Sequence, residues 1–255
     1  VAGGEALIEA VRRCFASLYT DRAVRYRLNN GFAHEDVALS VGIMKMVRSD
    51  LDSSGVMFTL DTESGHPDVV FVTAAYGLGE NVVQGTVDTD EFYVHKPTYR
   101  EGHRRVLRRA LGEKGQKMVY GGRRGGATIH NIPTTPEERA RFAIDDKGVL
   151  ELAGFAIAIE DHYSERAGKP MPMDIEWARD GLDGRIYIVQ ARPETVASQK
   201  RPDVLKHYHL RGSGEVRVSG RAVGGKIAAG AVRVIRSTED LKRFEPGEVL
   251  VAEMT

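Results

Sequence analysis

The sequence is poor in cysteine and contains no long hydrophobic run. A single cysteine, Cys14, excludes an intrachain disulfide, and its place in an apolar helical pattern is typical of a small buried hydrophobic residue. No apolar run approaches the ~18 residues of a transmembrane helix, and the N-terminus has no signal-peptide pattern. Lys plus Arg and Asp plus Glu each number 36, so the charge favours neither nucleic acid nor an acidic membrane surface. We therefore expect a cytoplasmic protein without nucleic-acid or membrane partners.

The most informative segment is Met173–Val196, which predicts two β-strands joined by a tight turn. Successive side chains of a strand take opposite faces of the sheet. Asp174 and Glu176 therefore share one face of the first strand, while the apolar residues between and beside them share the other. The segment places two carboxylates side by side on one face of a hairpin.

The return strand brings an amide and a guanidinium to the same patch. If the hairpin pairs symmetrically about Asp183, Glu176 lies opposite Gln190 and Asp174 lies opposite Arg192. Mg²⁺ on a nucleotide takes one or two carboxylates plus phosphate oxygens, and arginine suits the phosphates. A surface hairpin can also carry the same residues as ordinary cross-strand pairs, and the residues alone leave that alternative open.

The sequence of this hairpin resembles that of a known family. Asp-Ile-Glu-Trp-Ala, followed by Tyr-Ile-Val-Gln-Ala-Arg-Pro-Glu-Thr-Val, is similar to the end of the ATP-binding domain of the phosphoenolpyruvate synthase (pyruvate, water dikinase) family. A looser form, Asp-x-Glu followed by Gln-x-Arg, is shared with pyruvate phosphate dikinase and related antibiotic phosphotransferases. The resemblance implies that Glu176 and Gln190 bind Mg²⁺. It also implies that Arg192 contacts the transferred phosphates as a catalytic and cofactor-binding residue.

A second block, Met46–Gly85, resembles the same family through Met-Val-Arg-Ser, Ser-Gly-Val-Met-Phe and Gly-Leu-Gly-Glu. The resemblance implies an ATP-grasp fold in which a hinge strand before this block binds the adenine edge through backbone groups. Those groups would belong to Lys45, Met46 and Val47, and Glu80 would lie near the nucleotide. Met44 stands where many members have glutamine, which leaves recognition at this point to the backbone.

Hydrophobic periodicity predicts the remaining elements. Thr135, Pro136 and Glu138 form a capping box that starts a helix, and a further strand should follow the bend at Gly77 and Gly79. The segment 103–119 fits either a helix or strands, and 120–128 reads as an exposed loop. Helical patterns cover Glu5–Tyr19, Asp21–Asn30, Leu150–Tyr163 and Ser237–Phe244. Strand patterns cover Val37–Val47, Val56–Leu60, Val69–Thr73, Phe92–His95, Val216–Val218, Ala231–Ile235 and Glu248–Ala252.

The expected class is α+β. Residues 1–196 would form the C-terminal part of an ATP-grasp-like nucleotide-binding domain, and 197–204 a polar linker. Residues 205–255 would begin a β-rich swivelling phosphohistidine domain. The chain lacks an initiator methionine and the family's carrier-histidine motif, so we expect a segment of a longer protein.

The resemblance implies a parent enzyme that converts pyruvate, ATP and water to phosphoenolpyruvate, AMP and phosphate. ATP and Mg²⁺ would bind here, whereas pyruvate would bind only through a C-terminal domain absent from this chain, and the full-length enzyme would be able to form a homodimer. The alternatives are a dikinase or antibiotic phosphotransferase with another acceptor, and a non-catalytic nucleotide-binding module.

Overall fold

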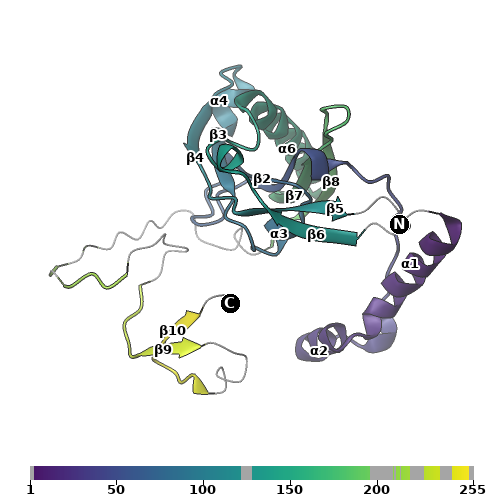
Figure 1. Ribbon diagram of the computed structural model, residues 1–255, viewed down its shortest axis with the longest axis horizontal. Helices are drawn as coiled ribbons and strands as arrows, with labels where there is room; N and C mark the ends of the chain where they lie inside the picture. Colours follow the sequence, from purple (N-terminus) through teal and green to yellow (C-terminus); the bar gives the residue numbers. More distant parts are fainter. Residues whose placement is uncertain are drawn as a thin grey trace.

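The computed structural model describes residues 3–121, 128–195, 209, 211–212, 214–218, 227–235 and 243–252. It mixes helices and β-sheets, in agreement with the predicted class (Figure 1). The α-helices are α1 Gly4–Ala16, α2 Asp21–Asn30, α3 Glu80–Val83, α4 Lys96–Arg100, α5 Pro136–Arg139 and α6 Asp146–Ala167. The short 3₁₀ helices are η1 Ser17–Tyr19, η2 His34–Asp36 and η3 Ser49–Leu51. The strands are β1 Ser53–Phe58, β2 Val69–Tyr76, β3 Asp90–His95, β4 Val106–Ala110, β5 Gln116–Gly121, β6 Thr128–Pro133, β7 Met173–Arg179, β8 Ile186–Pro193, β9 Val232–Ile235 and β10 Val249–Ala252.

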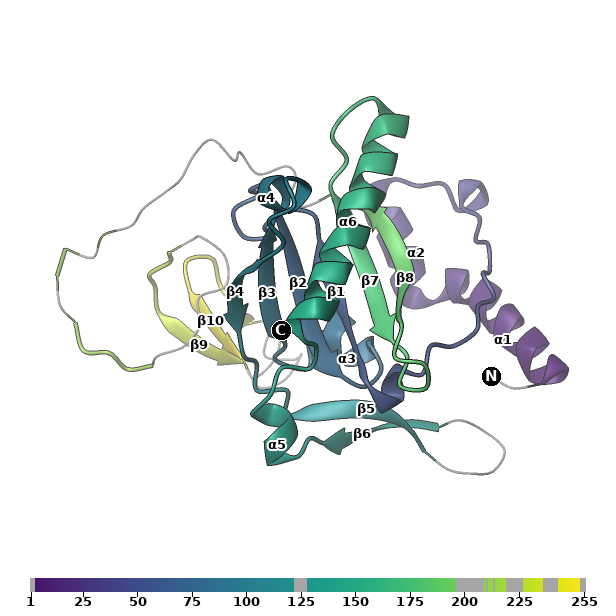
Figure 2. The same ribbon diagram turned by 90° about the horizontal axis from the view of Figure 1, so that it is seen from above.

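Six strands form the central sheet in the order β4-β3-β2-β1-β7-β8, and every neighbouring pair is antiparallel. Helix α6 crosses one face of this sheet, and α3 lies behind the sheet in the same view (Figure 2). Asp145 caps α6 by accepting a hydrogen bond from the Gly148 backbone N–H at 2.9 Å. The helix ends at Gly168 in the left-handed region, with φ of 64°.

The hydrophobic core lies between α6 and the sheet. Met173, Ile175 and Trp177 of β7 are almost completely buried there, which confirms the predicted alternation of the first hairpin strand. Burying each large side chain of this kind stabilises the fold by roughly 1.5–3 kcal/mol. Gly55 of β1 is paired with Trp177, and a Cβ at this position would lie 2.9 Å from the indole Cε2. The close packing of the indole therefore depends on a glycine in the neighbouring strand.

Strands β5 and β6 form a separate antiparallel hairpin that crosses below one end of the central sheet (Figure 2). It is attached to the end of β2, because Leu78 N–H donates to the Met118 carbonyl at 2.9 Å. Segment 103–119 thus holds strands β4 and β5, the second of its two predicted alternatives. Of the predicted exposed loop, Tyr120, Gly121 and Thr128 belong to strands, while 122–127 lie outside the described residues.

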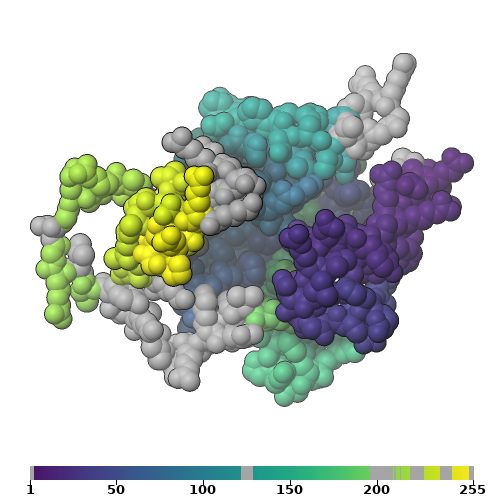
Figure 3. All heavy atoms as spheres, turned by 90° about the horizontal axis from the view of Figure 1, so that it is seen from below, coloured from purple at the N-terminus to yellow at the C-terminus, as the bar shows by residue number. Residues whose placement is uncertain are grey.

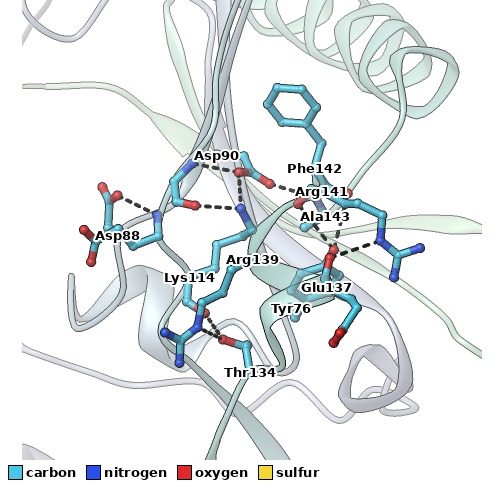
Figure 4. A network of polar contacts seen from close by, with 12 residues as sticks. Tyr76, Asp88, Asp90, Lys114, Thr134, Glu137, Arg139, Arg141, Phe142 and Ala143 are labelled. Carbon is cyan, nitrogen blue, oxygen red and sulfur yellow. Dashed lines mark hydrogen bonds and ion pairs between the residues drawn. The ribbon is translucent and has the colours of Figure 1, made fainter.

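A buried ion pair fixes this hairpin to the sheet and to the start of α6 (Figure 4). The Lys114 ammonium lies 2.5 Å from Asp90 Oδ1, and both side chains are fully buried. Asp90 also accepts from the backbone N–H groups of Gly112, at 2.9 Å, and Ala143, at 2.7 Å. Lys114 has a φ of 44°, which is uncommon for a residue with a side chain. One carboxylate therefore joins β3, the β4–β5 connection and the connection into α6.

The N-terminal helices and the capping box form where the sequence predicts them. Helix α2 has the predicted bounds, Asp21–Asn30, and α5 starts with the predicted box of Thr135 and Glu138. The expectation of a buried cysteine is wrong, because Cys14 is exposed. No residue of α1 is buried, so its apolar stripe packs against little of the described chain.

The C-terminal part contains a parallel pair of strands, β9 and β10. The predicted strand at Val216–Val218 is wrong, because these residues have no strand partner in the described part of the chain. Linker 197–204 and residues 237–242 of the predicted helix lie outside the described residues. Within the portion that the structure covers, no helix is both long enough and apolar enough to cross a membrane.

Candidate functional site

A cavity of about 610 Å³ lies on the side of the sheet that faces away from α6. This volume is within the range of small-molecule sites, roughly 300–1,000 Å³. The space-filling view of Figure 3, from the side opposite to that of Figure 2, shows this face hollowed between α1–α2 and β5–β6. Five of the residues expected to contact a nucleotide or its metal line the cavity: Lys45, Met46, Val47, Glu80 and Glu176.

The first wall is the extended segment that leads into η3. The predicted strand Val37–Val47 is wrong, since these residues have no sheet partner among the described residues. The segment is instead held at its end. Arg48 N–H donates to Asp180 Oδ2 at 3.2 Å, and the Arg48 carbonyl accepts from Gly181 N–H at 3.1 Å. Because residues 37–47 have no sheet partner among the described residues, their backbone N–H and carbonyl groups form no sheet hydrogen bonds there.

The second wall follows the glycine-rich bend after β2. Gly77 has a φ of 87°, and a Cβ there would lie 2.5 Å from the Met118 carbonyl oxygen, so the bend needs glycine at this position. The strand predicted to come next is wrong, because helix α3 follows Gly79. Glu80 is the first residue of that helix, and Oε1 of its carboxylate accepts from Gln84 Nε2 at 2.9 Å. Both side chains line the cavity.

The β7–β8 hairpin has the predicted register. Glu176 pairs with Gln190, and Asp174 pairs with Arg192. Arg192 Nε donates to Asp174 Oδ2 at 2.9 Å, and Nη2 lies 2.7 Å from the same oxygen in an ion pair. The Arg192 side chain is 66% exposed, so its guanidinium remains accessible while it is paired. Gln190 and Arg192 stand on the strand beside Glu176, but neither lines the cavity itself.

The carboxylate of Glu176 forms no ion pair with another described residue. Burial, and next the nearby charge of Asp174, raise the pKa of Glu176 above its ordinary value, against an opposing effect of Arg192. A bound cation would relieve both effects, so the site fits Mg²⁺. Within the described ranges, no three His, Cys, Asp or Glu side chains converge as a closed metal site. A cation here would therefore share its ligands with another molecule, as Mg²⁺ does with nucleotide phosphates.

Sequence reasoning missed the contribution of the β5–β6 hairpin to the cavity. Tyr120 and Ile129 are directly paired across the hairpin, and both line the cavity. The glycines and arginines that follow Tyr120 are typical of a loop, so the sequence did not indicate that β5 reaches Gly121 and that β6 begins at Thr128. One signal could have indicated the strand, namely the alternation of side chains from Lys117 to Tyr120, in which Met118 is buried.

Comparison with known proteins identifies relatives across the whole chain. A family model described as the pyruvate phosphate dikinase AMP/ATP-binding domain matches residues 1–211. Phosphoenolpyruvate synthase of Pseudomonas aeruginosa is 52% identical over 256 residues, covering 100% of this chain and 32% of the relative. The enzyme of the same name from Synechocystis sp. is 52% identical over 250 residues, covering 98% and 30%. That from Escherichia coli is 49% identical over 256 residues, covering 100% and 31%.

This chain therefore spans about a third of the length of the curated relatives that it matches. The family model, in contrast, covers most of the chain, including every residue of the cavity and of the β7–β8 hairpin. The chain belongs to the pyruvate phosphate dikinase AMP/ATP-binding domain family.

Proposed function

We propose that this chain is the nucleotide-binding part of a phosphoenolpyruvate synthase and that the cavity binds ATP together with Mg²⁺. The observation that carries the proposal is the convergence of three distant segments, 45–47, Glu80 and Glu176, on one cavity. The match to an AMP/ATP-binding domain and the printed names of the relatives support the same assignment.

Different residues of the cavity and the hairpin bind different parts of the nucleotide. Backbone groups of Lys45, Met46 and Val47 bind the edge of the adenine, which is consistent with an extended segment that has no sheet partner in the described part of the chain. Glu80 lies beside the nucleoside. The polar face of the β7–β8 hairpin binds the phosphate end, and the domain has the C-terminal part of an ATP-grasp-like fold.

On that polar face, Glu176 and Gln190 provide oxygen ligands for Mg²⁺, and Arg192 contacts the phosphates. Bound Mg²⁺ would neutralise phosphate charge in the transition state of phosphoryl transfer. The side chains need not act as acids or bases, because positioning and charge neutralisation supply most of the rate enhancement in this chemistry. The exposed guanidinium of Arg192 can turn from Asp174 to a phosphate at little cost, since such surface pairs are worth below about 1 kcal/mol.

In the longer protein, the overall reaction would convert pyruvate, ATP and water to phosphoenolpyruvate, AMP and phosphate. The phosphoryl group would pass through a histidine on a swivelling domain that begins within 205–255. Residues 197–204 would be the hinge between that domain and the nucleotide-binding domain, 1–196. The support for a hinge is the sequence, because polar residues and Pro202 separate two segments with strand patterns, a composition typical of linkers.

Isothermal titration calorimetry of the 255-residue chain with ATP, with and without Mg²⁺, tests the proposal. We expect Mg²⁺-dependent binding, and we expect Glu176→Ala to abolish its Mg²⁺ dependence. Glu151→Ala is the matched control, because Glu151 is an exposed glutamate on α6, on the other side of the sheet. A chain that does not bind ATP overturns the proposed function, and equal behaviour of the two variants overturns the assignment of Glu176.

A further inference from the structure

The cavity has one aromatic side chain available to a ligand. Among the described residues, two aromatic ones line it, Tyr120 and Trp177. Trp177 is 1% exposed and its indole packs into the core beneath α6. Tyr120 is half-buried, comes from the β5–β6 hairpin and stands beside Ile129. A planar ligand in this cavity therefore has the phenol ring of Tyr120 as its stacking partner.

The Tyr120 ring is held in place by a neighbouring arginine. The guanidinium of Arg48 lies 5.7 Å from the centroid of the Tyr120 ring, as a cation–π contact. Two hydrogen bonds to Asp50, at 2.7 and 2.8 Å, fix that guanidinium. Tyr120 lines the cavity, whereas Arg48 does not. A ring fixed in this way loses little conformational freedom when a ligand stacks on it.

The strand that carries Tyr120 is anchored at its start and near its middle. At the start of β5, the Asp90–Lys114 ion pair and the Thr134 hydroxyl, which donates to the Lys114 carbonyl at 2.5 Å, tie the hairpin to the sheet. Near its middle, the Met118 carbonyl accepts from Leu78 N–H, and Leu78 belongs to the second wall of the cavity. The hairpin thus acts as a fixed third wall of the cavity.

The lining around Tyr120 suits a base and not a triphosphate. The cavity lining is mainly apolar. Its charged residues are Lys45, Glu80 and Glu176, and the two carboxylates would repel phosphate in the absence of a cation. Besides Tyr120 and Trp177, the apolar lining residues are Met44, Met46, Val47, Leu78, Val83, Ile129, Ala178 and Val189. We propose that Tyr120 stacks on the nucleobase and that the β5–β6 hairpin is the wall that clamps the base against segment 45–47. This proposal rests on the proposed function, because it assigns the base of the ATP bound there.

The magnitude follows from base–aromatic stacking. Replacing a stacking aromatic residue weakens binding by about 5- to 150-fold, the equivalent of about 1–3 kcal/mol. Tyr120→Leu, which keeps an apolar side chain without a ring, should weaken ATP binding within that range. Tyr120→Phe keeps the ring and should bind ATP within about twofold of the unchanged chain. Tyr163→Ala, on α6 and away from the cavity, is the matched control and should bind ATP unchanged.

The measurement is calorimetric titration of each variant with ATP and Mg²⁺, after circular dichroism has shown equal unfolding midpoints for the Leu and Phe variants. If Tyr120→Leu binds ATP as tightly as the unchanged chain, the stacking role is wrong while the proposed function stands. If Tyr120→Phe is weakened as strongly as Tyr120→Leu, the hydroxyl and not the ring is responsible, and the stacking role is again wrong. If the unchanged chain does not bind ATP, the proposed function itself fails.

Discussion

Replacement of Asp90 should destabilise the protein more than replacement of its partner Lys114. Both side chains are fully buried, but the two groups differ in how many other partners they have. Asp90 accepts hydrogen bonds from three donors: Lys114 Nζ and the backbone N–H groups of Gly112 and Ala143. Lys114 Nζ donates to Asp90 and to the Gly112 carbonyl, at 2.8 Å. The carboxylate is therefore the centre of the network in Figure 4.

The expected losses follow from this asymmetry. Asp90→Ala leaves a buried ammonium without its counter-charge, which costs about 3–5 kcal/mol. It also leaves two buried N–H donors unpaired, at about 1–3 kcal/mol each. Lys114→Met leaves a carboxylate that keeps both backbone donors, so its loss should be near the lower end, about 3 kcal/mol. A small domain has only about 5–15 kcal/mol in total, so Asp90→Ala approaches complete unfolding.

Urea unfolding, followed by circular dichroism and by the fluorescence of the single tryptophan, Trp177, measures these losses. The double variant Asp90→Ala with Lys114→Met removes both charges and should be more stable than Asp90→Ala alone. Lys114→Met should fold, so its free energy of unfolding is the reference against which the other two variants are compared. The reasoning is refuted if Lys114→Met is as destabilising as Asp90→Ala, or if the double variant is the least stable of the three.

Three further outcomes test the site and the sheet. Glu176→Gln should weaken Mg²⁺-dependent ATP binding by at least about tenfold in calorimetry, since a neutral amide is a poorer Mg²⁺ ligand, without lowering the urea midpoint. Arg192→Lys should weaken binding of ATP but not of AMP, because the bidentate geometry is lost, and should change the free energy of unfolding by less than about 1 kcal/mol. Burial raises the pKa of Tyr93 to about 12, whereas an unfolded tyrosine titrates near about 10. The folded state then holds this proton more tightly, so stability should fall as pH rises from about 10 to about 12. Urea midpoints of Tyr93→Phe should fall less over that range; equal falls would contradict the assignment.

Elements with a strong local signal could be predicted from the sequence. Thr135 and Glu138 satisfy each other's backbone groups within four residues, so the capping box needs no distant partner. The same is true of α2, which starts at a threonine cap and ends at Gly31 with φ of 70°. The β7 strand alternates apolar and polar residues because one face packs under α6. In each case the information lies within the element or in its period.

The elements that failed depend on distant contacts. The segment Val37–Val47 is rich in apolar residues and reads as a strand, yet Ile43, Met44 and Met46 are 65%, 73% and 60% exposed. Met44 and Met46 line the cavity and do not belong to a buried sheet, and hydrophobic periodicity cannot distinguish these two roles. Lys114 is a buried lysine in a left-handed conformation, and its partner Asp90 is 24 residues away. No local rule would place that pair in the interior.

The pairing of Gln190 with Glu176 was predicted correctly, but the prediction did not include the β-bulge that produces it. Strict alternation from Ile186 and Ile188, which pack against the core, would turn Gln190 and Arg192 toward α6 as well. The ladder changes register between Glu176 and Trp177, so Val189 is an extra residue, a β-bulge. Beyond it, Ala191 faces the core, and Gln190 and Arg192 pair with the two carboxylates on the open face. Next to the turn, Arg179 pairs with Ile186, and continuing that register would pair Glu176 with Val189. The bulge adds one residue to β8 and shifts the register by one, so that Glu176 pairs with Gln190, as pairing about Asp183 predicts. The bulge thus moves two polar side chains out of the core and places Val189 in the cavity, so one local irregularity of β8 shapes both the polar face of the hairpin and the lining of the cavity.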